Sequence, residues 1–242
     1  MESRYDRWYS QDLARDMEIK FYGHGGKPVL FIPCQEGRFF DFENFGLIDA
    51  FAPFIEAGQV TVFCVDTVDR ETWSATDGDP ALRAQRHEAW MRYLAYDAAG
   101  YIREKCGEQG ILAYGASLGS LHAANLYFRF PEIFDAVLCL SGVYTASYGF
   151  GDWRDGTLYL NSPVDYLANM PWDHPYLGLY REHKAVFCVG QGPWEEPHYT
   201  RDLEYVMHQK GIPAWVDYWG WDAAHDWDWW KREIPYFLPH LL

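Results

Sequence analysis

The chain has 242 residues, of which 49% are hydrophobic. This length and composition favour a single α/β domain over residues 1–242 and argue against wholesale disorder. The 35 acidic and 20 basic residues give a net charge of −15, which opposes binding to nucleic acids and to anionic membranes because like charges repel.

No apolar stretch is long enough to cross a bilayer, and the polar N-terminus lacks the apolar core of a signal peptide. We therefore expect a cytoplasmic protein. The chain has five cysteines. Four of them lie in or at the end of apolar, strand-like runs, where thiols usually act as small buried hydrophobes: Cys34, Cys64, Cys139 and Cys188. No zinc-type Cys/His spacing exists, so the sequence predicts no metal site.

The first half of the chain predicts three strands and a long helix. Residues 17–23 alternate apolar and polar side chains, as in a half-buried strand, and 28–34 form a continuous apolar run. The turn GHGGKP (23–28) between them predicts a hairpin. A second buried strand is expected at 59–65, and apolar residues at helical spacing predict a helix over 83–106.

The second half repeats this alternation. Apolar runs predict four further strands, at 110–114, 136–141, 185–190 and 214–219. Helices are expected from Ser117 to about Phe130, near 200–210, and in the closing segment. Strands that alternate with helices indicate βαβ units and a mostly parallel sheet covered on both faces. Residues 143–184 interrupt the alternation and predict a cap or lid insertion, because long loops in compact domains are usually functional.

The insertion is also rich in aromatic residues: Tyr144, Tyr148, Phe150, Trp153 and Tyr159. They are compatible with an aromatic-lined substrate pocket and equally with ordinary packing of a small lid.

The segment Gly115-Ala-Ser117-Leu-Gly119 matches the pattern G-x-S-x-G. It follows a short apolar strand and precedes a helix, which is the setting of a nucleophile elbow. Glycine at both flanking positions relieves the crowding of a strained turn. The free N–H groups of the helix N-terminus then point at the reacting oxygen. We interpret Ser117 as a nucleophile.

A serine hydroxyl needs a base, and the fold that this elbow implies orders its triad as Ser, acid, His. Among nine histidines, His225 follows the last predicted strand after a short loop and is the expected base. His198 is the weaker alternative. His122 lies five residues after Ser117 on the same helix, so its side chain should point away from the nucleophile.

The acid should follow the penultimate strand, where the sequence reads Gly-Gln-Gly-Pro-Trp-Glu-Glu. Glu195 is favoured because the Gly-Pro-Trp turn should deliver it near the end of the strand. Glu196 is a close rival, and Asp222, on the loop that carries His225, is a third choice. The oxyanion hole requires two backbone N–H donors. We expect these from Leu118, just after the serine, and from Gln35, in the loop after strand 28–34.

Three stretches carry a resemblance to a known family. They are the elbow with FRFPEIFDAVLCLSGVY (128–144), the loop FIPCQEGRFFDFENFG (31–46), and GIPAWVDYWGWDAAHDWDWW (211–230). In these the chain resembles the "putative esterase" family of α/β-hydrolases, which includes esterase D-like, feruloyl esterase-like and mycolyltransferase-like members. The resemblance implies an α/β-hydrolase fold with Ser117 as nucleophile and His225 as base. It is less specific for the acid, because many members have Gly-x-x-Asp where this chain has Gly-Pro-Trp-Glu-Glu.

The leading hypothesis is a serine esterase that cleaves a small-molecule carboxylic ester through an acyl-enzyme, with no cofactor. One alternative keeps the acyl-enzyme but transfers the acyl group to an alcohol or amine. The other is a hydrolase fold without activity that serves as a binding protein.

Overall fold

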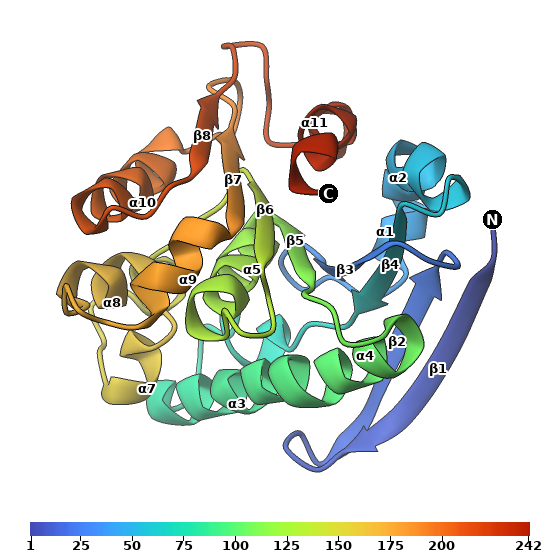
Figure 1. The fold of residues 1–242 in the computed structure, drawn as a ribbon. Helices are drawn as coiled ribbons and strands as arrows, with labels where there is room; N and C mark the ends of the chain where they lie inside the picture. The colour runs from blue at the N-terminus through green and yellow to red at the C-terminus, as the bar shows by residue number, and fades with distance from the viewer.

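The computed structural model describes all 242 residues and contains one eight-stranded sheet (Figure 1). The strands are β1 (Ser3–Ser10), β2 (Arg15–Tyr22), β3 (Lys27–Ile32), β4 (Val60–Val65), β5 (Leu112–Ala116), β6 (Ala136–Leu140), β7 (Lys184–Val189) and β8 (Trp215–Tyr218). They lie in the order β1-β2-β4-β3-β5-β6-β7-β8. β3 to β8 are parallel, whereas β1 and β2 are antiparallel to their neighbours. The predicted mostly parallel α/β sheet is confirmed.

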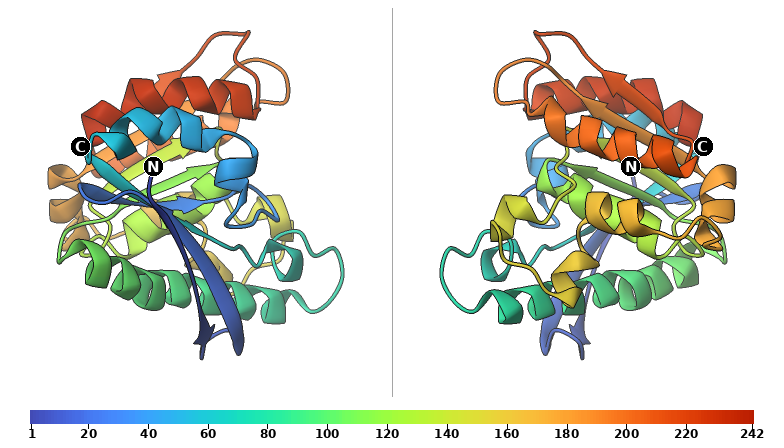
Figure 2. Two further views of the ribbon diagram at one scale, coloured as in Figure 1. Left: turned by 90° about the vertical axis from the view of Figure 1, so that its right-hand side faces the viewer. Right: turned by 90° about the vertical axis from the view of Figure 1, so that its left-hand side faces the viewer.

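The central strands are buried on both faces, which explains their continuous apolar sequences. In β3, Val29 and Phe31 belong to the core beneath the helices α2 (Leu47–Glu56) and α11 (Trp227–Leu241). Leu30 and Ile32 belong to the core on the opposite face. This alternation follows from the two-residue period of a strand. Figure 2 shows α2 and α11 on one side of the sheet and the longest helical segment on the other.

That opposite face is covered by the long helical segment and by α5 (Leu118–Arg129). The long segment is the helix predicted over 83–106. It consists of α3 (Pro80–Arg92), a π-helical stretch (Tyr93–Ala98) and α4 (Ala99–Cys106). The side chain of Asp79 starts it by accepting a hydrogen bond from the N–H of Ala81, which satisfies one of the free donors of a helix N-terminus.

The predicted hairpin between strands 17–23 and 28–34 is wrong. β2 pairs with β4, which lies between β2 and β3. All six residues of β4 are buried, so the backbone groups on both of its edges need partners. The turn at 23–28 passes the start of β4, where the N–H of Lys27 donates to the carbonyl oxygen of Gln59 at 2.8 Å. A hairpin would have left one edge of β4 unpaired.

The sequence analysis did not predict β1, because this strand has no alternation of apolar and polar residues. Its first five residues are all exposed, and it pairs only with β2 at the edge of the sheet. Together β1 and β2 extend beyond the rest of the sheet (Figure 2). Charged side chains on such an edge discourage pairing with other chains.

The segment 143–184 contains four short helices: α6 (Ser147–Phe150), α7 (Gly156–Tyr159), α8 (Pro163–Asn169) and α9 (Tyr176–Glu182). α8 packs against α5 and against α10 (Pro197–Lys210). Tyr144 and Phe150 are buried. Most of this segment therefore extends the layer of helices on the α5 face of the sheet.

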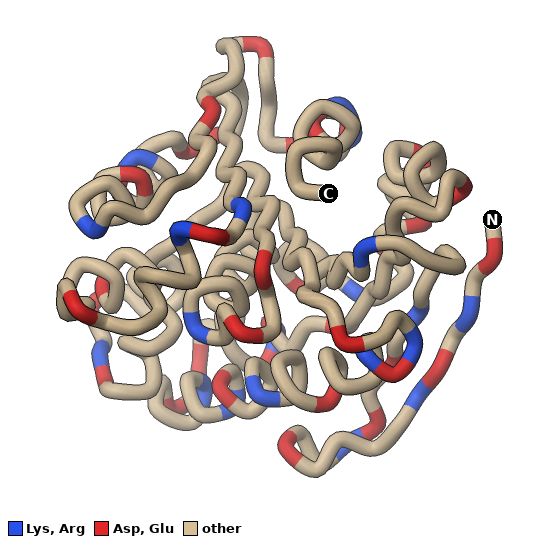
Figure 3. Tube along the Cα trace, in the orientation of Figure 1, with Lys and Arg blue, Asp and Glu red and all other residues tan.

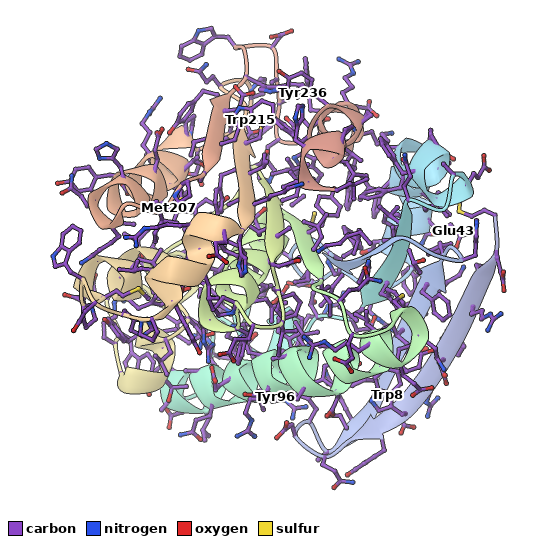
Figure 4. All side chains as sticks on the ribbon, viewed as in Figure 1. Trp8, Glu43, Tyr96, Met207, Trp215 and Tyr236 are labelled. Carbon is purple, nitrogen blue, oxygen red and sulfur yellow. The ribbon has the colours of Figure 1, made fainter.

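Aromatic side chains pack α11 against β8, the last strand of the sheet. Trp215 of β8 and Tyr236 of α11 lie together in Figure 4, with ring centroids 5.6 Å apart. This contact packs α11 against the last strand. Charged residues are dispersed along the chain, with Lys and Arg scattered among acidic residues (Figure 3). No helix has the length and apolar character needed to pass through a bilayer.

Candidate active site

Ser117 lies in a sharp turn between β5 and α5. Its backbone has φ 56° and ψ −130°, a strained conformation for a residue other than glycine, which costs about 1–3 kcal/mol. A Cβ on Gly115 would lie 2.1 Å from the carbonyl oxygen of Gly119. One on Gly119 would lie 2.5 Å from that of Ile32 in β3. Gly115 is therefore required by the tight turn from β5 into α5, and Gly119 by the close approach of α5 to the end of β3.

A continuous hydrogen-bonded chain runs from Ser117 through His225 to Glu195. His225 Nε2 lies 2.9 Å from Ser117 Oγ, and His225 Nδ1 lies 3.3 Å from Glu195 Oε2. The Glu195 side chain is only 2% exposed, whereas His225 is 26% exposed. A buried carboxylate that accepts from Nδ1 holds the imidazole in the tautomer that leaves Nε2 free to accept the serine proton.

Glu195 is itself held by two further donors. Its Oε1 accepts from Ser141 Oγ at 2.6 Å and from the N–H of Gly190 at 3.2 Å. Ser141 Oγ in turn accepts from Trp230 Nε1 at 2.9 Å. These hydrogen bonds compensate for the burial of the carboxylate.

Two adjacent loops deliver Glu195 and His225 to the same place. One follows β7 and the other follows β8. Three backbone hydrogen bonds join the loops: Gln191 N–H to Gly220 O (3.2 Å), Gly192 N–H to Ala223 O (2.8 Å) and His225 N–H to Pro193 O (3.0 Å). A Cβ on Gly192 would lie 2.5 Å from the carbonyl oxygen of Ala223, so only glycine permits this approach. Trp194 has φ 66°, so the turn before Glu195 is strained as well.

The alternative acids and the alternative base do not take part in the hydrogen-bonded series Ser117–His225–Glu195. Glu196 and Asp222 are exposed, and neither forms a hydrogen bond with a histidine. His198 is exposed and packs on Tyr199, with ring centroids 4.0 Å apart. His122 is fully buried and contacts Asp69 rather than Ser117.

The loop that carries Gln35 lies against the elbow. Gln35 is exposed, and its backbone N–H donates no hydrogen bond within the chain. Its side chain is fixed at both ends: Nε2 donates to Ser74 Oγ at 2.8 Å, and Oε1 accepts from the hydroxyl of Tyr148 at 3.1 Å. Leu118 is the first residue of α5. Its N–H therefore belongs to the helix-terminal donors that have no partner inside the helix.

A buried contact between Asp69 and His122 lies beneath this loop. Asp69 is fully buried, and its Oδ2 accepts from the N–H of Glu36 at 3.1 Å. Its Oδ1 lies 3.1 Å from Nε2 of His122, which belongs to α5. Asp69 therefore links the loop of Gln35 to the helix that starts at Ser117.

A pocket of about 120 Å³ contains Ser117 and His225. The other side chains and backbone segments that line it are Ser141, Gly142, Val143, Tyr148, Trp194, Glu196 and Tyr199. Of the aromatic residues in the 143–184 segment, only Tyr148 belongs to this lining. The rest of that aromatic set contributes to packing.

The sequence did not single out Ser141, Asp69 or Glu233. Glu233 is 1% exposed on α11, and burial together with the negative charge of Glu195 raises its pKa to about 8. The position of Ser141 could have indicated its role, because it directly follows β6, the strand next to β5, at the carboxyl edge of the sheet. No such indication existed for Asp69 and Glu233, since single carboxylates in this acidic chain usually lie on the surface.

Residues 10–241 match the model of a protein family described as "Putative esterase". The chain belongs to this family. It is an esterase, an enzyme that hydrolyses carboxylic esters, and the recognised resemblance is confirmed. No curated protein matched the chain in a sequence search.

Solved structures share the fold of this esterase at low sequence identity. A ferulic acid esterase aligns with 15% identity and a TM-score of 0.77, covering 99% of this chain and 97% of the other. An S-formylglutathione hydrolase from Agrobacterium tumefaciens aligns with 13% identity and a TM-score of 0.75, covering 98% and 93%. The fluorophosphonate-binding serine hydrolase F of Staphylococcus aureus aligns with 11% identity and a TM-score of 0.72, covering 99% and 98%. These similarities confirm the α/β-hydrolase fold.

Proposed function

We propose that this esterase works through an acyl-enzyme formed on Ser117, with a Ser117–His225–Glu195 triad. The observation that supports it best is the hydrogen-bonded chain from Ser117 Oγ through both ring nitrogens of His225 to a buried carboxylate. Distances of about 2.6–3.2 Å between nucleophile and base suit proton transfer.

In the first half of the reaction, Ser117 Oγ attacks the ester carbonyl carbon and its proton passes to His225 Nε2. The carbonyl oxygen becomes an oxyanion, which the N–H groups of Leu118 and Gln35 stabilise. The imidazolium then protonates the leaving alkoxide, and the C–O bond breaks to leave an acyl-Ser117 ester. Glu195 stays ionised throughout and stabilises the imidazolium.

In the second half, His225 accepts a proton from water, which attacks the acyl carbon. The second tetrahedral intermediate collapses, the proton returns to Ser117 Oγ, and the carboxylic acid leaves. The pocket of about 120 Å³ is well below the range of about 300–1,000 Å³ that is usual for sites of drug-sized ligands. We therefore expect a small group to bind beside Ser117.

Labelling with a fluorophosphonate probe tests the nucleophile directly, because the probe forms a covalent bond with an activated serine. We expect the wild-type protein to be labelled and to hydrolyse p-nitrophenyl acetate, and Ser117→Ala to do neither while retaining its circular dichroism spectrum. Labelling of a folded Ser117→Ala variant would contradict the proposal. Adding alcohols as acceptors distinguishes hydrolysis from acyl transfer: if most of the acyl group appeared as a new ester, the enzyme would be an acyltransferase.

A further inference from the structure

The pocket beside Ser117 holds one formal negative charge and no Lys or Arg side chain. Glu196 supplies the charge, and its carboxylate forms no hydrogen bond or ion pair within the chain. It is the N-cap residue of α10, a position from which a side chain commonly caps the helix, yet it makes no cap hydrogen bond. Glu196 is therefore an unpaired anion in the lining of the site.

Three aromatic residues accompany this carboxylate. Tyr148 and Tyr199 stand nearly perpendicular, with an interplanar angle of 85° and ring centroids 6.3 Å apart. Both tyrosines and Glu196 line the same pocket, and burial together with the negative charge of Glu196 raises the pKa of both phenols. Trp194 lines the same pocket and is 87% exposed, so its indole face is open to a ligand.

Rings set at right angles around an open site, with a carboxylate beside them, suit a cation. The faces of aromatic rings are electronegative, and sets of two or three rings recognise ammonium groups, quaternary ones above all. A carboxylate strengthens such a site, whereas an anionic substrate would meet repulsion from Glu196 and from the overall charge of −15.

We propose that Glu196, Tyr148, Tyr199 and Trp194 form a subsite for a positively charged group, and that this esterase prefers esters that carry an ammonium group near the scissile bond. The proposal rests on the proposed function of Ser117 for its catalytic consequence. The binding of the cation itself depends only on the subsite.

Two pairs of isosteric esters test the preference. Acetylcholine and 3,3-dimethylbutyl acetate differ only by nitrogen for carbon on the alcohol side. Phenyl esters of 4-(trimethylammonio)butyrate and 5,5-dimethylhexanoate do the same on the acyl side. We expect the ratio of kcat/KM, cationic over neutral, to exceed 1 for at least one pair, to fall about fivefold or more in Glu196→Gln, and to decrease with added salt.

Glu56→Gln is the matched control. Glu56 is an exposed carboxylate at the end of α2 without an ion pair, so its removal changes the net charge equally but should leave the ratio as in the wild type. A ratio that is equal in wild type and Glu196→Gln for both pairs would overturn the proposal.

A binding measurement separates this inference from the proposed mechanism. Calorimetric titration of tetramethylammonium chloride into Ser117→Ala, against sodium chloride at the same ionic strength, needs no turnover. We expect binding that is weakened in Ser117→Ala/Glu196→Gln. Hydrolysis of the neutral esters without any cation effect or binding would refute the subsite and leave the triad intact. Binding of the cation by a protein that hydrolyses no ester would refute the triad and leave the subsite intact.

Discussion

The turn around Ser117 and the loop around Glu195 each contribute one side chain to the proposed triad, but they are specified over different distances. The elbow is recognisable from five consecutive residues around the strained Ser117: Gly115 makes room for the backbone of Gly119 within the turn, and Gly119 makes room for the end of β3. Glu195 is held by Gly190, five residues before it, and by partners far along the chain, which are Ser141 just after β6 and the β8–α11 loop. A catalytic nucleophile can thus be encoded locally, while its acid depends on packing.

The largest effect is expected at the elbow and its direct partner. His225→Ala should reduce kcat about a millionfold, as Ser117→Ala should, because nucleophile and base act as a unit. Steady-state kinetics with p-nitrophenyl acetate measures this. His198→Ala is the control and should retain activity within a fewfold, since His198 is exposed and makes no hydrogen bond with Ser117. An inactive His198→Ala beside an active His225→Ala would reverse the assignment of the base.

Glu195→Gln tests the half of the site that depends on packing. The variant keeps the shape of the side chain but loses the charge that stabilises the imidazolium. We expect a loss of roughly ten-thousandfold in kcat, smaller than for the nucleophile, as for the acid of a well-studied protease. Asp222→Asn, on the His225 loop, should have little effect because Asp222 is exposed and makes no bond to His225. If Asp222→Asn were the inactive variant, the acid would lie on the histidine loop.

Asp69→Asn tests how far the loop that carries Gln35 also depends on a distant, buried side chain. The amide replaces one of the two acceptor oxygens with an NH2 donor, so either the bond to Glu36 N–H is lost or Nε2 of His122 must become the acceptor, and both changes disturb the loop. We expect kcat to fall about tenfold with little change in KM, which is a smaller decrease than the 10²–10³-fold fall in kcat on removal of a direct oxyanion donor. The affinity for a boronic acid, which mimics the tetrahedral intermediate, should fall by a similar factor.

Glu88→Gln is the control, because it weakens the hydrogen bonds that Glu88 accepts from Arg129 and should lower Tm but not kcat. An Asp69→Asn variant with lower Tm and unchanged boronate affinity would show that Asp69 serves stability alone.

The smallest effect concerns stability rather than rate. The pKa of Glu233 is raised to about 8 in the folded protein from an ordinary value near 4.5, so the folded state holds a proton that the unfolded state has lost between these values. Stability from this residue therefore falls as pH rises from about 4.5 to 8. Glu233→Gln should remove that loss, gaining on the wild type over this range by at most a few kcal/mol. Urea unfolding at pH 5 and pH 8 measures the difference, and a gain that shrinks toward pH 8 would contradict the assignment.

The alternation of apolar strands and helices sufficed to predict the parallel sheet and the long helix over 83–106, because burial on both faces imposes a visible pattern. It did not reveal β1, whose exposed side chains carry no pattern, or that β4 lies between β2 and β3. Strand order depends on which edges pair across the sheet, and a short turn such as 23–28 permits either arrangement. The predicted hairpin was wrong because it considered only the short turn and not the pairing of β4 with both β2 and β3.

The site divides in the same way. By itself the sequence determined the elbow at Ser117, since strand, glycines, serine and helix are adjacent, and it gave His225 a position after the last strand. Only the tertiary structure brought Glu195, rather than Glu196 or Asp222, against His225 Nδ1, because three backbone bonds between the two loops and the donors Ser141 and Gly190 fix its place. The tertiary structure likewise buried Asp69 and Glu233, whose properties come from neighbours distant in sequence. Short-range steric requirements are written in adjacent residues, whereas burial and charge environment exist only once the chain has folded.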